Sequence, residues 1–299
     1  MTHMKNTIFF GNGINRLSEN NVTWSDLLDN IKGSNKFESG QLPNTMVYER
    51  IFLEKHAPDR NEKKDELEIK KVIADGLREQ GPNEVLKALA SLPIEHYLTT
   101  NYDYAFEKTL NISPVKLSSE DIYSLRRKRM YESESDTKFL WNIHGEIDNP
   151  KSIMLGLDHY CGSVSKIDTY VKGTYSHKIN GADVTIKSML DKLRDTSFCH
   201  TSWVDLFFSS NVHILGFSLD YSETDIWWLL NKRARFSSEA TISNKIYFYT
   251  HNISDEKKGL LEAFNIEVII IKVIDDSFEN MYWSAIKNIN INLNQDMVA

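Results

Sequence analysis

Short runs of apolar, β-favouring residues recur along the chain, and most are followed by a segment with helical periodicity. The runs are apolar at nearly every position, which is typical of strands that are buried on both faces of a parallel sheet. Strands that alternate with helices predict an α/β protein with a Rossmann-like, doubly wound, mostly parallel sheet. The predicted strands cover 7–10, 96–100, 138–143, 152–155, 211–215, 245–249 and 266–271.

Two segments interrupt this alternation. Residues 42–92 are charged and carry apolar residues at helical spacing, so we expect a helical lobe or insertion there. Residues 161–205 are rich in Gly, Ser, Thr and Tyr with little periodicity, and we expect a loop or small subdomain. Both belong to one predicted domain over 1–299. Thr23 and Asp26 form a variant of the capping box, which predicts a helix through 31.

Polar residues and glycines follow several of the predicted strands. Because the carboxyl ends of the strands share one edge of a doubly wound sheet, we expect these residues to line one crevice that binds a dinucleotide. Glycine-loop N–H groups and a helix N-terminus would take the phosphates, and Ser218 with Asp103 or Asp225 would bind ribose hydroxyls. The candidate residues are Gly11, Asn12, Gly13, Asn15, Thr100, Asn101, Asp103, His144, Gly216, Ser218 and Asp225.

The central candidates also have structural interpretations. Asn101 lies at a strand-to-helix turn, where asparagine often caps the helix that follows. Asp103 is able to cap the same helix and to orient Asn101, or to bind ribose. His144 is equally explained as a buried histidine that is hydrogen-bonded within the sheet. These alternatives stay open at the level of the residues alone.

Charge argues against a protein whose main surface binds nucleic acid, because the net charge is −7 in 299 residues. The dense cationic cluster, residues 126–129, is followed at once by acidic residues. We interpret it as a solvated helix end or loop, with polynucleotide contact as the minor alternative.

Cysteine content and hydropathy restrict the cofactor and the compartment. Cys161 and Cys199 are too few for a tetrahedral structural zinc site, and no paired metal-ligand spacing occurs, so we predict no catalytic metal. No signal segment and no apolar run of membrane-spanning length is evident, which predicts a cytoplasmic protein without membrane contact.

The ordered set of motifs resembles the sirtuin-like domain family, particularly its bacterial branch in antiphage defence. The likeness extends over about 8–235, and the family usually has Gly-Ala-Gly-Ile-Ser where this chain has residues 11–15. The motifs that carry it are Gly11-Asn-Gly13-Ile-Asn15, Trp24-Ser-Asp-Leu-Leu28, Thr99-Thr-Asn-Tyr-Asp103, His144-Gly145 and Gly216-Phe-Ser-Leu-Asp220.

The resemblance implies consumption of NAD. In the family the corresponding asparagine and histidine act at the bond between nicotinamide and ribose, so Asn101 would orient ribose or water and His144 would serve as general base. The proline-and-arginine loop and the zinc ribbon of the sirtuin deacylases are absent from this sequence. Plain hydrolysis of NAD therefore fits better than deacylation.

The resulting hypothesis is an NAD glycohydrolase (NADase) that depletes NAD in antiphage defence. Unrestrained activity would kill the host. In its compact size the chain resembles family members that are encoded beside a HerA-type hexameric ATPase. We therefore expect a homo-oligomer controlled by such a partner. One alternative is a module that senses NAD or ADP-ribose without turnover. The other is a DNA-processing subunit of a defence complex, which is motivated only by the cationic cluster at 126–129.

Overall fold

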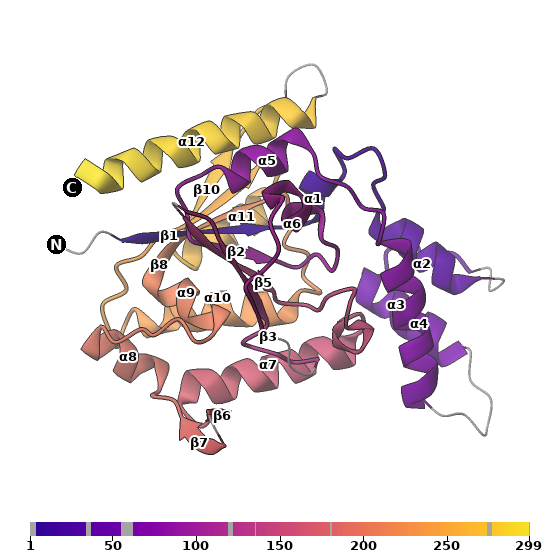
Figure 1. The fold of residues 1–299 in the computed structure, drawn as a ribbon, viewed down its shortest axis with the longest axis horizontal. Coiled ribbons are helices and arrows are strands. Elements are labelled where there is room, and N and C mark those ends of the chain that lie inside the picture. The colour runs from indigo at the N-terminus through magenta and orange to yellow at the C-terminus, as the bar shows by residue number, and fades with distance from the viewer. Residues whose placement is uncertain are drawn as a thin grey trace.

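A single large sheet forms the centre of the protein and helices cover both of its faces (Figure 1). The computed structural model describes residues 4–33, 37–54, 62–118, 122–134, 136–179, 181–273 and 277–298. The strand order is β10-β9-β8-β1-β2-β5-β4-β3. Its strands are β1 (Lys5–Phe10), β2 (His96–Thr99), β3 (Lys116–Ser118), β4 (Lys128–Glu132), β5 (Thr137–Asn142), β8 (Ser210–Leu215), β9 (Ile246–Thr250) and β10 (Ile266–Ile270).

The predicted Rossmann-like, mostly parallel sheet is confirmed. Strand β1 lies between β2 and β8 and pairs in parallel with both. Strands β3 and β4 extend one edge in antiparallel pairing. Every residue of β8 is buried, because a strand between two neighbours with helices on both faces contacts no solvent.

Side chains of β1 alternate between two hydrophobic cores, as the period of two in a strand requires. Phe9 packs with α7, α9 and α10 on one face, whereas Ile8 and Phe10 pack with α5 and α12 on the other. Figure 1 shows these two groups of helices on opposite sides of the sheet. The helices are α1 (Asn12–Asn15), α2 (Trp24–Lys32), α3 (Asn44–Glu54), α4 (Glu62–Gly76), α5 (Glu84–Ala90), α6 (Ala105–Leu110), α7 (Leu157–Lys172), α8 (Met189–Asp195), α9 (Trp203–Ser209), α10 (Thr224–Phe236), α11 (Asp255–Ala263) and α12 (Phe278–Val298).

Helices α2, α3 and α4 form a separate group at one side of the sheet, with a hydrophobic core of their own (Figure 1). Tyr102, after β2, and Ile153, after β5, belong to this core and join the group to the sheet. Helix α5, which falls within the lobe expected over 42–92, packs on the sheet with α6 and α12 instead. The lobe boundary therefore differs from the expected one, because the apolar face of α5 matches the sheet. Residues 55–61 lie outside the described residues.

The capping box at the start of α2 is confirmed. The backbone N–H of Thr23 donates to Asp26 at 2.8 Å, and the N–H of Asp26 donates to the Thr23 hydroxyl at 3.2 Å. The reciprocal bonds satisfy groups that have no partner within the helix, which fixes the helix start at Trp24.

Three sequence expectations are wrong. Residues 152–155, expected as a strand of the sheet, are the end of the 3-10 helix Pro150–Ser152 and a buried loop whose apolar side chains, such as Ile153, join the core of the helical group. Residues 161–172, expected as part of a loop or small subdomain, form all of α7 after its first four residues, because Ile167 and Tyr170 give it a buried face that its polar residues obscure. Only the part after Gly173 contains the small antiparallel pair β6 (Ser176–Ile179) and β7 (Ala182–Thr185). The cationic cluster is no solvated end either: Arg127 is 1% exposed, and Arg129 pairs with the buried Glu146 at 2.5 Å.

None of the helices in the described ranges combines the length and the apolar character that a membrane span requires.

Candidate active site

A cavity of about 600 Å³ lies at the carboxyl ends of β1, β2, β5, β8 and β9. This is the edge at which doubly wound sheets bind their ligands. The predicted residues that line it are Asn12, Gly13, Thr100, Asn101, Asp103, His144, Gly216 and Ser218. The predicted residues behind its wall are Gly11, Asn15 and Asp225.

The glycine turn after β1 packs directly on the turn after β8. The N–H of Gly13 donates to the carbonyl of Gly216 at 2.8 Å, and the N–H of Gly11 donates to the carbonyl of Leu215 at 3.2 Å. A Cβ atom on Gly11 would lie 2.7 Å from the Gly216 oxygen, and Gly216 has φ +64°. These glycines therefore allow two backbones to meet, and the N–H groups of Gly11 and Gly13 are used within the protein rather than free for phosphate.

Asn101 presents an unused amide to the cavity. Its backbone N–H donates to the Thr99 hydroxyl at 3.0 Å, which fixes the turn at the end of β2. The side chain is buried, and its Nδ2 atom has no hydrogen-bond partner among the described residues. Buried polar groups are nearly always paired. An unpaired buried amide N–H at a cavity therefore indicates a position where an atom of a ligand accepts its hydrogen bond.

The Asp103 side chain holds the start of α6, one residue before the N-cap residue Tyr104. One carboxylate oxygen accepts from the N–H of Ala105 at 2.9 Å, at the start of α6, and the other accepts from Nδ2 of Asn15 at 2.8 Å. Burial raises the pKa of Asp103 to about 6, against these hydrogen bonds. The capping alternative thus describes its contacts, and Asn15 acts through Asp103 rather than at the cavity surface.

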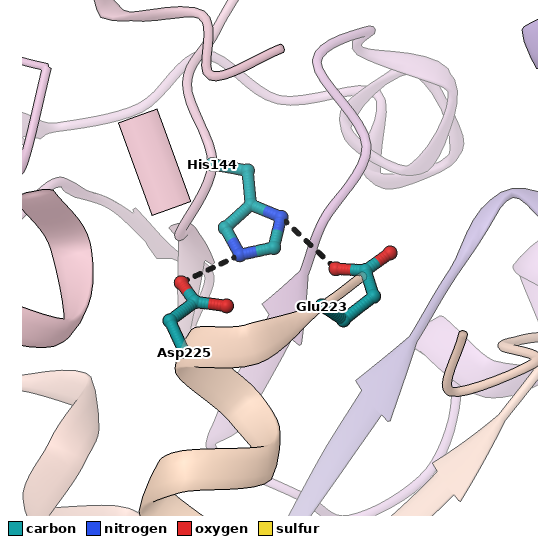
Figure 2. A group of neighbouring side chains, drawn as sticks. All are labelled: His144, Glu223 and Asp225. Atoms are coloured by element: carbon teal, nitrogen blue, oxygen red, sulfur yellow. Dashed lines mark hydrogen bonds and ion pairs between the residues drawn. The ribbon is translucent and has the colours of Figure 1, made fainter. Parts of the chain in front are cut away.

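His144, directly after β5, lies between two carboxylates (Figure 2). Its Nε2 atom is 3.1 Å from Asp225 Oδ2, and its Nδ1 atom is 3.7 Å from Glu223 Oε2. Asp225 is fully buried whereas Glu223 lines the cavity, so the Nδ1 edge of the ring is the edge on the cavity side. The carbonyl of His144 accepts from the N–H of Met154 at 2.9 Å, which fixes the backbone that carries the ring.

The Asp225 side chain contacts His144 and does not line the cavity. Besides the imidazole, its side chain accepts from the Ser163 hydroxyl at 2.8 Å and from the N–H of Ile226 at 2.8 Å. The carboxylate is therefore fully hydrogen-bonded beneath the ring. Its place in the first turn of α10 also favours a negative charge.

Electrostatics at the three groups favour a charged imidazole. Burial opposes the charge, but the Asp225 and Glu223 carboxylates outweigh it and raise the pKa of His144 above 6.5. For comparison, burial alone lowers the pKa of His213, which bonds Tyr249 and Asn6, to about 3. Burial raises the pKa of Glu223 to about 7, with His144 acting in the opposite direction.

His144, Glu223 and Asp225 are also the group in the described ranges that is close enough to hold a metal ion. However, the two carboxylates face different nitrogens at separate edges of the ring (Figure 2). When the imidazole is protonated, each ring nitrogen faces one carboxylate. The geometry therefore matches an imidazolium between two acids.

Side chains from distant segments complete the walls. Trp24 of α2 enters from the helical group and packs edge-on against Tyr102 at 5.9 Å between ring centres. Lys257 of α11 donates to the carbonyls of Ser218 and Leu219 at 2.8 and 2.6 Å, which holds the turn after β8 in place. The sequence analysis missed Glu223, Trp24 as a wall residue, and Lys257. The sequence offered one indication that Glu223 lines the cavity, which is its position between the motif 216–220 and α10.

A family model described as a SIR2-like domain matches residues 95–269, which is more than half of the chain. The chain belongs to the SIR2-like domain family. The match covers the cavity residues from Thr100 to Lys257 and leaves the glycine turn and the helical group outside.

Three curated relatives of this SIR2-like chain are each named NAD(+) hydrolase ThsA. The protein of Bacillus cereus (strain MSX-D12) is 27% identical over 170 residues, which is 55% of this chain and 33% of that protein. The proteins of Enterococcus faecium and Cytobacillus dafuensis are 25% and 26% identical, over 51% of this chain and 30% and 29% of theirs. The chain thus spans about a third of the length of these relatives.

Proposed function

We propose that this SIR2-like chain hydrolyses NAD to nicotinamide and ADP-ribose. The observation that carries the proposal is the convergence of Asn101, with its unpaired buried amide, and His144 on one cavity of about 600 Å³. That volume lies in the usual range for cofactor sites. The relatives named NAD(+) hydrolase add independent support.

The chemistry needs few groups from the protein. A water oxygen bonds to the ribose carbon C1′, the bond from C1′ to the nicotinamide nitrogen breaks, and its electron pair neutralises the pyridinium ring. The leaving group therefore needs no acid. The Asn101 amide holds a ribose hydroxyl or the water, and the Nδ1 edge of His144 donates to the reacting ribose. The water must lose one proton to a group in the cavity.

The test follows nicotinamide release by chromatography after incubation of the purified chain with NAD. We expect Asn101→Ala and His144→Ala to bind NAD within about threefold of the wild type and to release nicotinamide at least about 100-fold more slowly. Asn290→Ala and His177→Ala, outside the cavity, are matched controls that should keep the wild-type rate. A wild type that binds NAD but releases no nicotinamide, even with the HerA-type ATPase present, would contradict the proposal and favour the sensing module.

As a biological role we propose NAD depletion in antiphage defence, by a homo-oligomer that a HerA-type ATPase controls. The support is chemical: free hydrolysis of NAD would exhaust the host, so its activity needs restraint. Light scattering of the purified chain tests the homo-oligomer. Nicotinamide release measured with and without the ATPase tests the control. A monomer whose rate is unchanged by the ATPase would contradict both. The cationic cluster at 126–129 no longer supports the DNA-processing alternative, because Arg127 and Arg129 form ion pairs with Glu146.

A further inference from the structure

The proposed hydrolysis requires a base, and the contacts of His144 leave it unsuited to that task. Its Nε2 atom is 3.1 Å from Asp225 and its Nδ1 atom is 3.7 Å from Glu223, while the ring is buried. An imidazole between two carboxylates carries a proton on both nitrogens. Such a ring donates at both edges and has no lone pair that is free to accept a proton from water.

Glu223 has what His144 lacks. Its side chain lines the cavity and is 15% exposed, and its Oε2 atom has no hydrogen-bond partner in the part of the chain that the structure describes. The Tyr160 hydroxyl interacts with the same carboxylate and acts to lower its pKa. The unpaired oxygen is itself buried and lies 3.7 Å from Nδ1 of His144, on the side of the ring that borders the cavity.

We propose that Glu223 accepts the proton of the attacking water while His144 keeps both of its protons. The inference rests on the proposed hydrolysis of NAD. As the water oxygen bonds to C1′ and the electron pair of the broken C1′–N bond passes to nicotinamide, the proton moves to Glu223 Oε2. The His144 cation balances the negative carboxylate before the transfer, and the proton is later released to solvent.

The other acids near the cavity are occupied. Asp225 is fully buried beneath His144 and accepts from Ser163 and Ile226, and both oxygens of Asp103 accept hydrogen bonds. The groups that face Glu223 are His144 after β5, Asp225 of α10, Asp220 of the preceding turn, Tyr160 of α7 and Tyr102 after β2. Burial among them raises the pKa of Glu223 to about 7, which suits a general base near neutral pH.

The experiment measures kcat and KM for nicotinamide release between about pH 5.5 and pH 8.5. We expect the wild-type kcat to rise with pH through about 7. Glu223→Gln should lower kcat at least about 100-fold, leave KM within about threefold and abolish the rise. Glu223→Asp should keep part of the rate, and formate should restore part of it to Glu223→Ala. Glu262→Gln makes the same change at an exposed carboxylate of α11, outside the cavity, and should change nothing.

The competing assignment gives the opposite pattern. If His144 is the base, His144→Gln loses the rise with pH and Glu223→Gln keeps it, with kcat reduced by less than about threefold. That result overturns the inference, as does a Glu223→Ala variant that formate fails to rescue. Failure of the proposed function looks different, because then the wild type itself releases no nicotinamide at any pH.

Discussion

Replacement of Asp225 by Asn tests whether His144 is charged in the folded protein. The substitution keeps the size of the side chain and its bond from the Ile226 N–H, but removes the charge beneath the ring. The new amide is able to donate to Nε2, which holds the imidazole neutral with its proton on Nδ1. Glu223 then remains as the carboxylate within 4 Å of the ring in the described structure.

The expected cost depends on pH. The folded pKa of His144 is raised, so its contribution to stability is complete below the unfolded value of 6.5 and is lost as pH rises through the folded pKa. In the variant burial prevails, as it does at His213, and the folded pKa falls below 6.5. The variant therefore loses stability as pH falls, where the wild type does not.

The magnitude follows from the buried pair. Removing one partner of a buried ion pair costs about 3–5 kcal/mol, and each unit of pKa corresponds to about 1.4 kcal/mol. We expect the free energy of unfolding of Asp225→Asn to lie about 3 kcal/mol below the wild type at about pH 6. At about pH 8.5 the difference should shrink toward the roughly 1 kcal/mol of one hydrogen bond.

Equilibrium urea denaturation at the two pH values measures this difference, with Asp195→Asn as the control for loss of an exposed carboxylate outside the cavity. A difference that is the same at both pH values would refute the reasoning, because a neutral His144 gives no pH-dependent term. It would also remove the reason for assigning the base to Glu223.

Three further substitutions test the framework of the site. Gly11→Ala should lower the free energy of unfolding by about 1–3 kcal/mol, seen as a lower melting temperature, because its Cβ would lie 2.7 Å from the Gly216 oxygen. Lys257→Ala releases the turn after β8 and should raise KM for NAD more than it lowers kcat; equal effects on both would contradict a holding role. Arg127→Met should cost about 3 kcal/mol in urea denaturation, because it leaves the buried Glu146 short of a partner, and unchanged stability would contradict the ion pair.

The sheet could be predicted because its strands are buried on both faces. Near-continuous apolar runs such as 245–249 have few other interpretations. Because parallel strands end at one edge of the sheet, the sequence also predicted that Asn101 and His144 lie close together. The capping box at Thr23 was readable for a similar reason, since its bonds span three residues. In each case the deciding contacts are local or follow from the strand pattern.

Features that depend on distant partners could not be predicted. The polar sequence of α7 hides its helical period, and its buried face becomes apparent only beside α10. Arg127 looks solvent-exposed in a cationic run, yet it is buried because Glu146, nineteen positions along, lies opposite. Asp225 was placed at the cavity by its neighbourhood in sequence, whereas the start of α10 turns it inward beneath His144.

The charge state of His144 could not be predicted from the sequence. A histidine after a strand suggests a base, since its ordinary pKa is near neutral. The sign of its shift depends on acids at 223 and 225, which the fold places on either side of a ring from residue 144. The same placement leaves Oε2 of Glu223 unpaired at the cavity. One arrangement both protonates the imidazole and leaves the Glu223 oxygen without a hydrogen bond. The assignments of His144 as a cation and of Glu223 as the base therefore depend on each other, and the pH dependence of Glu223→Gln tests both.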